Sequence, residues 1–166
     1  VHRDPRSVMA SYKKMTNEVG YTYLNTIFNF VDSVQSLNKF EKKYGKHKIL
    51  QVKSEDIANN PKKILIKICN FLDVEFSNKM MDPNSNAFLL GESWSNNTSF
   101  RKEIIGFPKP HEKWKKYLTN SEILFLELIS QPFLKNMKYE SFHYEKDLNF
   151  EMFNDFLKDD YIRDLF

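Results

Sequence analysis

The chain begins with the stretch VHRDPRSVMASY, residues 1–12, which predicts the end of a strand followed directly by a helix. Asp4 and Pro5 are typical of a helix start, because Asp accepts hydrogen bonds from the first free backbone N–H groups and Pro has no N–H to leave unsatisfied. Arg3 therefore stands at the junction of strand and helix, and Ser11 follows about two turns later. An Arg and a Ser beside a helix N-terminus form a candidate anion site.

Length and composition limit the fold and the partners. The 166 residues suffice for one domain with a core but favour no second domain, and an apolar content of 41% argues against disorder. The net charge of +3 is spread along the chain, so we expect no nucleic-acid groove, which needs clustered Lys and Arg. The lone Cys69 favours a reducing, cytoplasmic setting. No apolar run approaches the roughly 18 residues of a transmembrane segment.

Apolar spacing and helix-boundary signals predict four helices. We expect them over residues 5–19, 23–44, 61–72 and 123–133. The third begins after Asn60 with Pro61, and the last follows a capping box from Thr119 to Glu122. The helices over residues 23–44 and 61–72 have apolar residues at helical spacing, and the apolar face of the latter includes Cys69 and Leu72.

One buried strand and one long loop complete the prediction. The apolar run HKILQV, residues 47–52, has the length of a strand, and residues 75–113 are rich in Asn, Ser and Pro. One strand and one strand end cannot form a sheet. Either the chain is mostly helical or its sheet lies upstream of residue 1, and we favour the second alternative.

Three blocks of sequence, in order, resemble the sulfotransferases that use 3′-phosphoadenosine 5′-phosphosulfate (PAPS). HRDPRSVMASY is similar to the family motif R-[DN]-P-[RK]-x-x-x-x-S, which binds the 3′-phosphate, and Arg3, Pro5 and Ser11 match it in full. LQVKSEDIANNPKKILIKICNFLDVEF resembles a strand, a Glu-Asp-Leu segment and a helix that ends in Phe-Leu-Gly, with Asp73 at the place of the Gly.

The third block, SWSNNTSFRKEIIGFPKPHEKWKKYLTNSE, resembles the late loop of the family, with Arg101 and Lys102 at its Arg-Lys pair. Many members have Gly after this pair, whereas this chain has Glu103, whose carboxylate would repel a phosphate unless it turns away. An equally good alternative is that Arg101 and Lys102 are simply charged side chains exposed to solvent, with no ligand. Trp114 is expected to anchor the loop by burying its ring.

The resemblance implies an α/β fold of the P-loop NTPase-like sulfotransferase type. Residues 1–140 would form the C-terminal, helix-rich part of the domain, and residues 141–166 a helical tail. The phosphate-binding loop and the catalytic base of the family would lie upstream of residue 1, so the catalytic residues are unknown and we expect this segment alone to be inactive.

The resemblance also implies the reaction. The enzyme would transfer a sulfuryl group from PAPS, its co-substrate, to a hydroxyl or amine of a small-molecule, lipid or carbohydrate acceptor. Arg3 and Ser11, with Arg101 and Lys102, would bind the 3′-phosphate, and we expect no metal. For Arg3, the alternative is a surface ion pair with Asp4 or another neighbour. For the whole chain, the alternatives are a non-catalytic sulfotransferase-like binding or interaction module and an unrelated helical protein.

Overall fold

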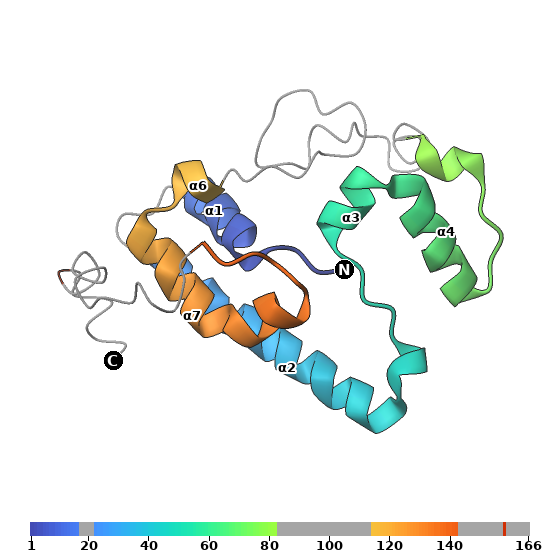
Figure 1. Ribbon diagram of the computed structural model, residues 1–166, viewed down its shortest axis with the longest axis horizontal. Helices are drawn as coiled ribbons and strands as arrows, with labels where there is room; N and C mark the ends of the chain where they lie inside the picture. The colour runs from blue at the N-terminus through green and yellow to red at the C-terminus, as the bar shows by residue number, and fades with distance from the viewer. Residues whose placement is uncertain (17–21, 83–113, 143–157, 159–166) are drawn as a thin grey trace. The chain divides into compact units, whose positions relative to one another are not determined.

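Figure 1 shows the computed structural model of the chain, which describes residues 1–16, 22–82, 114–142 and 158. The α-helices of these residues are α1 (Pro5–Thr16), α2 (Thr26–Tyr44), α3 (Ser54–Asn59), α4 (Pro61–Leu72), α6 (Trp114–Tyr117) and α7 (Asn120–Asn136). Short 3-10 helices cover Thr22–Asn25, Lys46–Lys48 and Asn78–Met81. The chain separates into two compact units, and we describe each by itself: a first unit of Val1–Arg3 and Gly45–His111, and a second of Asp4–Tyr44 and Glu112–Phe166.

The second unit is a set of helices around an apolar core. Helix α7 packs against both α1 and α2, and Phe30 of α2 meets Phe133 of α7 edge to face, with ring centroids 4.8 Å apart. The core is formed by buried residues of α1, the turn before α2, α2, α6, the link from α6 to α7, and α7: Met9, Ala10, Tyr23, Leu24, Ile27, Trp114, Leu118, Ile123, Phe125 and Leu126. Burial of these side chains is the main stabilising contribution to this unit.

Helix α1 begins where the sequence predicts it. The Asp4 carbonyl accepts the first helical hydrogen bond, from Val8 N at 3.1 Å, and the Asp4 carboxylate accepts from the backbone N–H of Arg6 at 2.9 Å. The carboxylate thus satisfies one of the orphan donors of the first turn. The predicted Asp-Pro helix start is confirmed, whereas the predicted last turn, residues 17–19, lies outside the described residues.

Helix α7 begins with the predicted capping box. Thr119 Oγ1 accepts from Glu122 N at 3.3 Å, and a Glu122 carboxylate oxygen accepts from Thr119 N at 2.6 Å. The Glu122 carboxylate is fully buried and also binds Lys13 Nζ of α1, at 2.8 and 2.9 Å to its two oxygens. The ammonium group therefore neutralises a carboxylate that would otherwise be costly to bury.

In the first unit, α4 begins at Pro61 and ends at Leu72, as predicted. The Asn60 side chain, however, makes no capping hydrogen bond, and Leu72, predicted on the apolar face, is 59% exposed. The helix stops because Asp73 adopts the left-handed conformation, with φ 55°. Val74 N donates to the carbonyl of Cys69 at 3.0 Å, which is the pattern of a Schellman motif.

The predicted strand over residues 47–52 is wrong. Residues Lys46–Lys48 form a 3-10 helix, and the described residues contain an isolated parallel bridge between His2 and Lys53 but no strand ladder. Two backbone hydrogen bonds flank this bridge, from His2 N to Val52 O and from Ser54 N to His2 O, both 2.7 Å. A strand needs a run of such pairs, and the predicted α/β sheet stays a prediction.

Helix α3 lies where the sequence analysis expected no helix. Its first turn contains Glu55 and Asp56, whose negative charges favour the N-terminal end of a helix.

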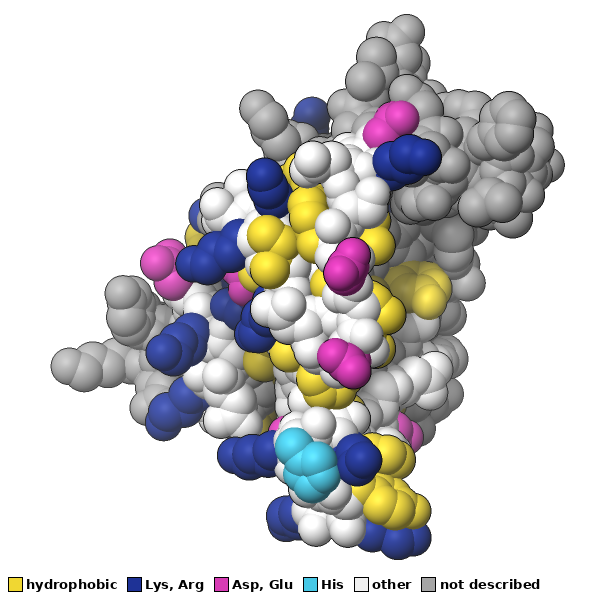
Figure 2. Space-filling model, turned by 90° about the vertical axis from the view of Figure 1, so that its right-hand side faces the viewer, with side chains coloured by type: hydrophobic (Ala, Val, Ile, Leu, Met, Phe, Trp, Pro, Cys, Tyr) yellow, Lys and Arg dark blue, Asp and Glu magenta, His cyan; other side chains and the backbone are white. Residues whose placement is uncertain are grey.

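The face of the molecule seen in Figure 2 bears hydrophobic side chains at the surface among Lys and Arg side chains. The exposed apolar residues of the first unit include Ile66, Phe71, Leu72, Val74 and Met80.

Candidate functional site

Arg3, the first residue of the predicted phosphate motif, is exposed and belongs to the first unit. Among the described residues its guanidinium group has no ion pair or hydrogen bond. The Asp4 carboxylate, one of the alternative partners expected for Arg3, binds Arg6 through both of its oxygens. The described ion pair of Asp4 is thus with Arg6 and not with Arg3, whose guanidinium group is the one that the motif would offer to an anion.

Ser11, the last residue of the motif, lies in the middle of α1 in the second unit and is half-buried. Its hydroxyl donates to the backbone carbonyl of Ser7 at 3.0 Å, a common bond for Ser within a helix. The single hydroxyl hydrogen is used in this bond, so the Ser11 oxygen can only accept further hydrogen bonds. Donation to a phosphate therefore requires the hydroxyl to break its bond to the Ser7 carbonyl. The joint role of Arg3 and Ser11 in binding one phosphate stays a prediction.

Arg101 and Lys102, the second predicted pair of phosphate ligands, lie outside the described residues, as does Glu103. Trp114, where the described chain resumes, is buried as predicted for a loop anchor. Its ring meets that of Phe142 edge to face, with centroids 5.7 Å apart.

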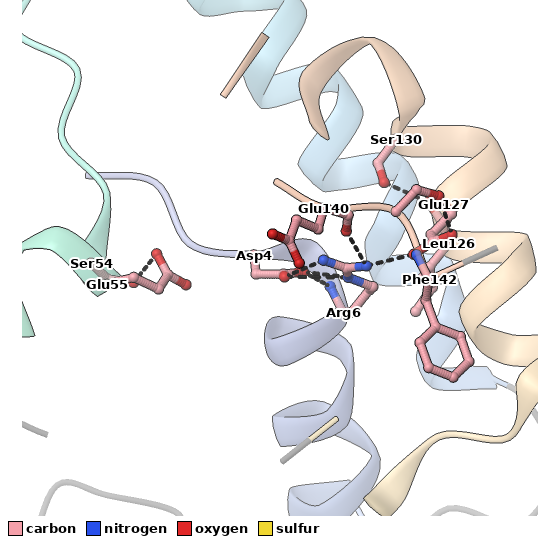
Figure 3. A network of polar contacts seen from close by, with 10 residues as sticks. Asp4, Arg6, Ser54, Glu55, Leu126, Glu127, Ser130, Glu140 and Phe142 are labelled. Atoms are coloured by element: carbon pink, nitrogen blue, oxygen red, sulfur yellow. Dashed lines mark hydrogen bonds and ion pairs between the residues drawn. The ribbon is translucent and has the colours of Figure 1, made fainter. Parts of the chain in front are cut away.

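The structure adds a buried polar network at the start of α1, centred on Arg6 (Figure 3). Arg6 is only 3% exposed. Its Nε and Nη2 donate to the Asp4 carboxylate, at 3.0 Å to Oδ1 and 2.7 Å to Oδ2 respectively. Its Nη1 donates to Glu127 Oε1 and to the backbone carbonyl of Glu140, the latter at 2.9 Å. The guanidinium carbon also lies 4.2 Å from the centroid of the Trp114 ring.

Glu127 of α7 is held in place from its other side by the chain that follows the helix. The Ser141 hydroxyl donates to Oε2 at 2.8 Å, and the backbone N–H of Phe142 donates to Oε1 at 2.7 Å. The carboxylate of Glu127 thus accepts from three different donors and is itself buried. The network joins α1, α7 and the segment that contains Ser141 and Phe142.

The electrostatics of Arg6 reflect these two carboxylates. Burial by itself would lower the pKa of Arg6, but the hydrogen bonds and negative charges of Asp4 and Glu127 outweigh it, so the pKa is raised from its ordinary value. Arg6 is therefore a permanent cation within this network. It is a structural ion pair partner, whereas Arg3, three residues earlier, remains exposed.

The sequence analysis missed this network, although the sequence contains two signals for it. Arg6 stands in the first turn of a helix, where a positive charge is unfavourable unless it is paired. Glu127 is an isolated carboxylate in the apolar run ILFLELI, residues 123–129. Each signal indicates a buried ion pair, but neither identifies the other as its partner.

Comparison with protein families identifies the part of the chain that carries the motif. Residues 1–78 match the sulfotransferase family. The predicted resemblance to a sulfotransferase family is thereby confirmed for these residues, which include Arg3, Pro5 and Ser11 and the whole of the second block, but not Arg101 and Lys102. The family supports a transferase role and fits a sulfotransferase fold. The comparison with curated proteins found no match, and the comparison with solved structures found none either.

The described residues contain no group of three or more His, Cys, Asp or Glu side chains placed to hold a metal ion. None of the helices within residues 1–16, 22–82 and 114–142 is long and apolar enough to cross a membrane.

Proposed function

We propose that this sulfotransferase-family protein transfers a sulfuryl group from PAPS to a hydroxyl or amine of a small-molecule, lipid or carbohydrate acceptor. The observation that carries the proposal is the family match over residues 1–78, within which Arg3, Pro5 and Ser11 stand at the spacing of the 3′-phosphate motif. We do not favour a non-catalytic module, because no observation points to the loss of the transferase role.

In this proposal, Arg3 and Ser11 bind the 3′-phosphate of the donor, with Arg101 and Lys102 as further cationic groups. A guanidinium group makes paired hydrogen bonds to phosphate oxygens, and the exposure of Arg3 leaves its donors accessible. The 3′-phosphate is remote from the sulfur that is transferred. Its binding therefore contributes affinity and orientation, while the transfer step depends on positioning of the reactants and stabilisation of charge.

The lone Cys69, which is unpaired and buried, supports the further proposal of a cytoplasmic protein, because reducing compartments keep thiols free.

No residue of the chain is proposed as a metal ligand. PAPS is the co-substrate that the reaction requires.

Calorimetric titration of full-length protein with adenosine 3′,5′-bisphosphate, the product that retains the 3′-phosphate, tests this proposal. We expect Arg3→Ala to weaken binding by roughly 10- to 100-fold, the loss expected for a charged hydrogen bond of about 1.5–3 kcal/mol. Its unfolding midpoint should not change, because Arg3 has no described partner in the folded protein.

The matched control is Lys67→Ala, which removes one positive charge from an exposed position on α4 in the same unit. We expect Lys67→Ala to bind the bisphosphate like the wild type, since Lys67 does not belong to the motif. Equal affinity of Arg3→Ala and wild type would remove Arg3 from the site. Equal loss in both variants would reduce its role to a general effect of charge.

A further inference from the structure

Helix α1, which carries Ser11, is tied to α7 at two points by ion pairs, of which the first is buried and the second is half-buried on its Lys side. Arg6 binds Glu127 near one end of α1, and Lys13 binds Glu122 two turns later. Along the chain, Ser11 lies between these two anchors. Because these pairs join the two helices at separate points along their length, sliding of α1 along α7 would disrupt both of them.

The first anchor is the more restrictive of the two. Within the described residues, four of the five N–H donors of Arg6 have acceptors, and these acceptors come from Asp4, Glu127 and Glu140. The Trp114 ring covers the guanidinium group, and the side chain is 3% exposed. A planar group bound along several edges fixes direction as well as position, which an ammonium group cannot do.

Asp4 transmits this restraint to the backbone of α1. The same Oδ1 atom accepts from the backbone N–H of Arg6 and from its Nε. The capping carboxylate therefore cannot change rotamer without breaking the ion pair as well. Ser11 lies on the same helix, so the position of its backbone and Cβ follows the orientation of the first turn.

Stability alone is a weak reason for this arrangement. The cost of removing a guanidinium and two carboxylates from water offsets much of their attraction, and apolar residues of similar volume often stabilise a core as well or better. Hydrogen bonds with defined directions fix the orientation of α1 more precisely than apolar packing would. A misplacement of about 1 Å at a binding group is enough to weaken recognition strongly.

We propose that Arg6 is a positioning residue that, through Asp4 and Glu127, holds α1 in the orientation in which Ser11 meets the 3′-phosphate. This inference rests on the proposed function. It assigns no contact between Arg6 and the nucleotide, because Arg6 is buried and four of its five N–H donors are directed to protein acceptors.

The test compares two ligands that differ by the 3′-phosphate alone. Full-length protein is titrated with adenosine 3′,5′-bisphosphate and with adenosine 5′-monophosphate, and the ratio of the two affinities is the readout. Arg6→Lys keeps the positive charge but loses the planar guanidinium group and its several N–H donors. We expect it to lower this ratio by about tenfold, or about 1.4 kcal/mol. Loss of folded protein alone would lower the binding stoichiometry without changing the ratio.

The control is Thr119→Ala, which removes the cap of α7 but no group of the network. We expect it to lower the unfolding midpoint and to leave the ratio unchanged. If Arg6→Lys does not fold, Ser141→Ala serves in its place, because it removes the hydroxyl that orients Glu127 from the edge of the network. We expect this milder change to lower the ratio about two- to fivefold.

The outcomes separate the two proposals. If the wild type binds both nucleotides equally, the proposed 3′-phosphate site is wrong, and the inference falls with it. If the wild type prefers the bisphosphate but the ratio is unchanged in Arg6→Lys, or in Ser141→Ala where the former does not fold, the site stands and the positioning role of Arg6 is overturned. A fall in the ratio in the network variant, with none in Thr119→Ala, supports the inference.

Discussion

Three charged residues close together at the start of the chain have different roles. Asp4 and Arg6 are buried and bind one another, whereas Arg3 is exposed. In this chain, the stretch from Arg3 to Arg6 thus combines one exposed basic residue with an acid and a base that fix the helix start. Arg6 is buried against the carboxylates of Asp4 and Glu127, so Arg3 is the accessible one of the two arginines.

At the residue scale, His2 predicts a pH dependence of stability. Burial lowers the pKa of His2 below its ordinary value of 6.5, and the hydrogen bond from Nε2 to Gln51 Oε1, 2.9 Å long, opposes this shift only in part. Between the lowered pKa and about 6.5, the unfolded chain binds more protons than the folded one. The stability is therefore fully present above about 6.5 and is lost as the pH falls through the lowered pKa.

We expect His2→Gln to abolish this part of the pH dependence, because Gln keeps a donor for Gln51 and does not titrate. Urea unfolding at about pH 7 and about pH 5 measures it, and the wild type should lose more free energy of unfolding than the variant. Equal losses in the two proteins would show that His2 does not contribute.

At the scale of elements, two helix starts that look alike in the sequence differ in the structure. The Thr119 hydroxyl accepts from Glu122 N, whereas the Asn60 side chain makes no such bond. We expect Thr119→Ala to lower the free energy of unfolding by about 1 kcal/mol and Asn60→Ala to change it by less than about 0.5 kcal/mol. Urea unfolding of both variants measures the difference, and equal effects would contradict the assignment of these caps.

The end of α4 predicts a stabilising substitution. Asp73 has φ 55°, a conformation that costs an L-residue energy and that Gly adopts freely. We expect Asp73→Gly to raise the free energy of unfolding by about 0.5–1 kcal/mol. Asp73→Ala is the matched control, because it removes the same charge but keeps a Cβ. A lower stability of Asp73→Gly than of Asp73→Ala in urea unfolding would contradict this account.

The sequence predicts those element boundaries that local chemistry determines. The start of α1 at Pro5, both ends of α4 and the capping box of α7 depend on residues within a few positions of one another. The strand over residues 47–52 was predicted wrongly, because a strand forms through pairing with distant residues, and the described pairing amounts to one bridge. Helix α3 was missed although Glu55 and Asp56 are typical of a first helical turn.

At the scale of the whole molecule, the residues that match the sulfotransferase family are held in part by contacts with residues outside the matched range. Residues 1–78 include Arg6, but its partner Glu127 and the Glu140 carbonyl lie more than a hundred residues later in the chain. Arg3 and Ser11 could be proposed as site residues from the sequence because the motif that they match is contiguous. The network was not, since no local pattern pairs a residue in the first turn of α1 with one in α7.

The central claim is that this chain recognises the 3′-phosphate of a sulfuryl donor. Calorimetric titration of full-length wild-type protein with adenosine 3′,5′-bisphosphate and with adenosine 5′-monophosphate tests it most directly. We predict that the bisphosphate binds at least about tenfold more tightly, as expected when a phosphate gains charged hydrogen bonds. Equal affinity for the two nucleotides, or binding of neither, would contradict the claim.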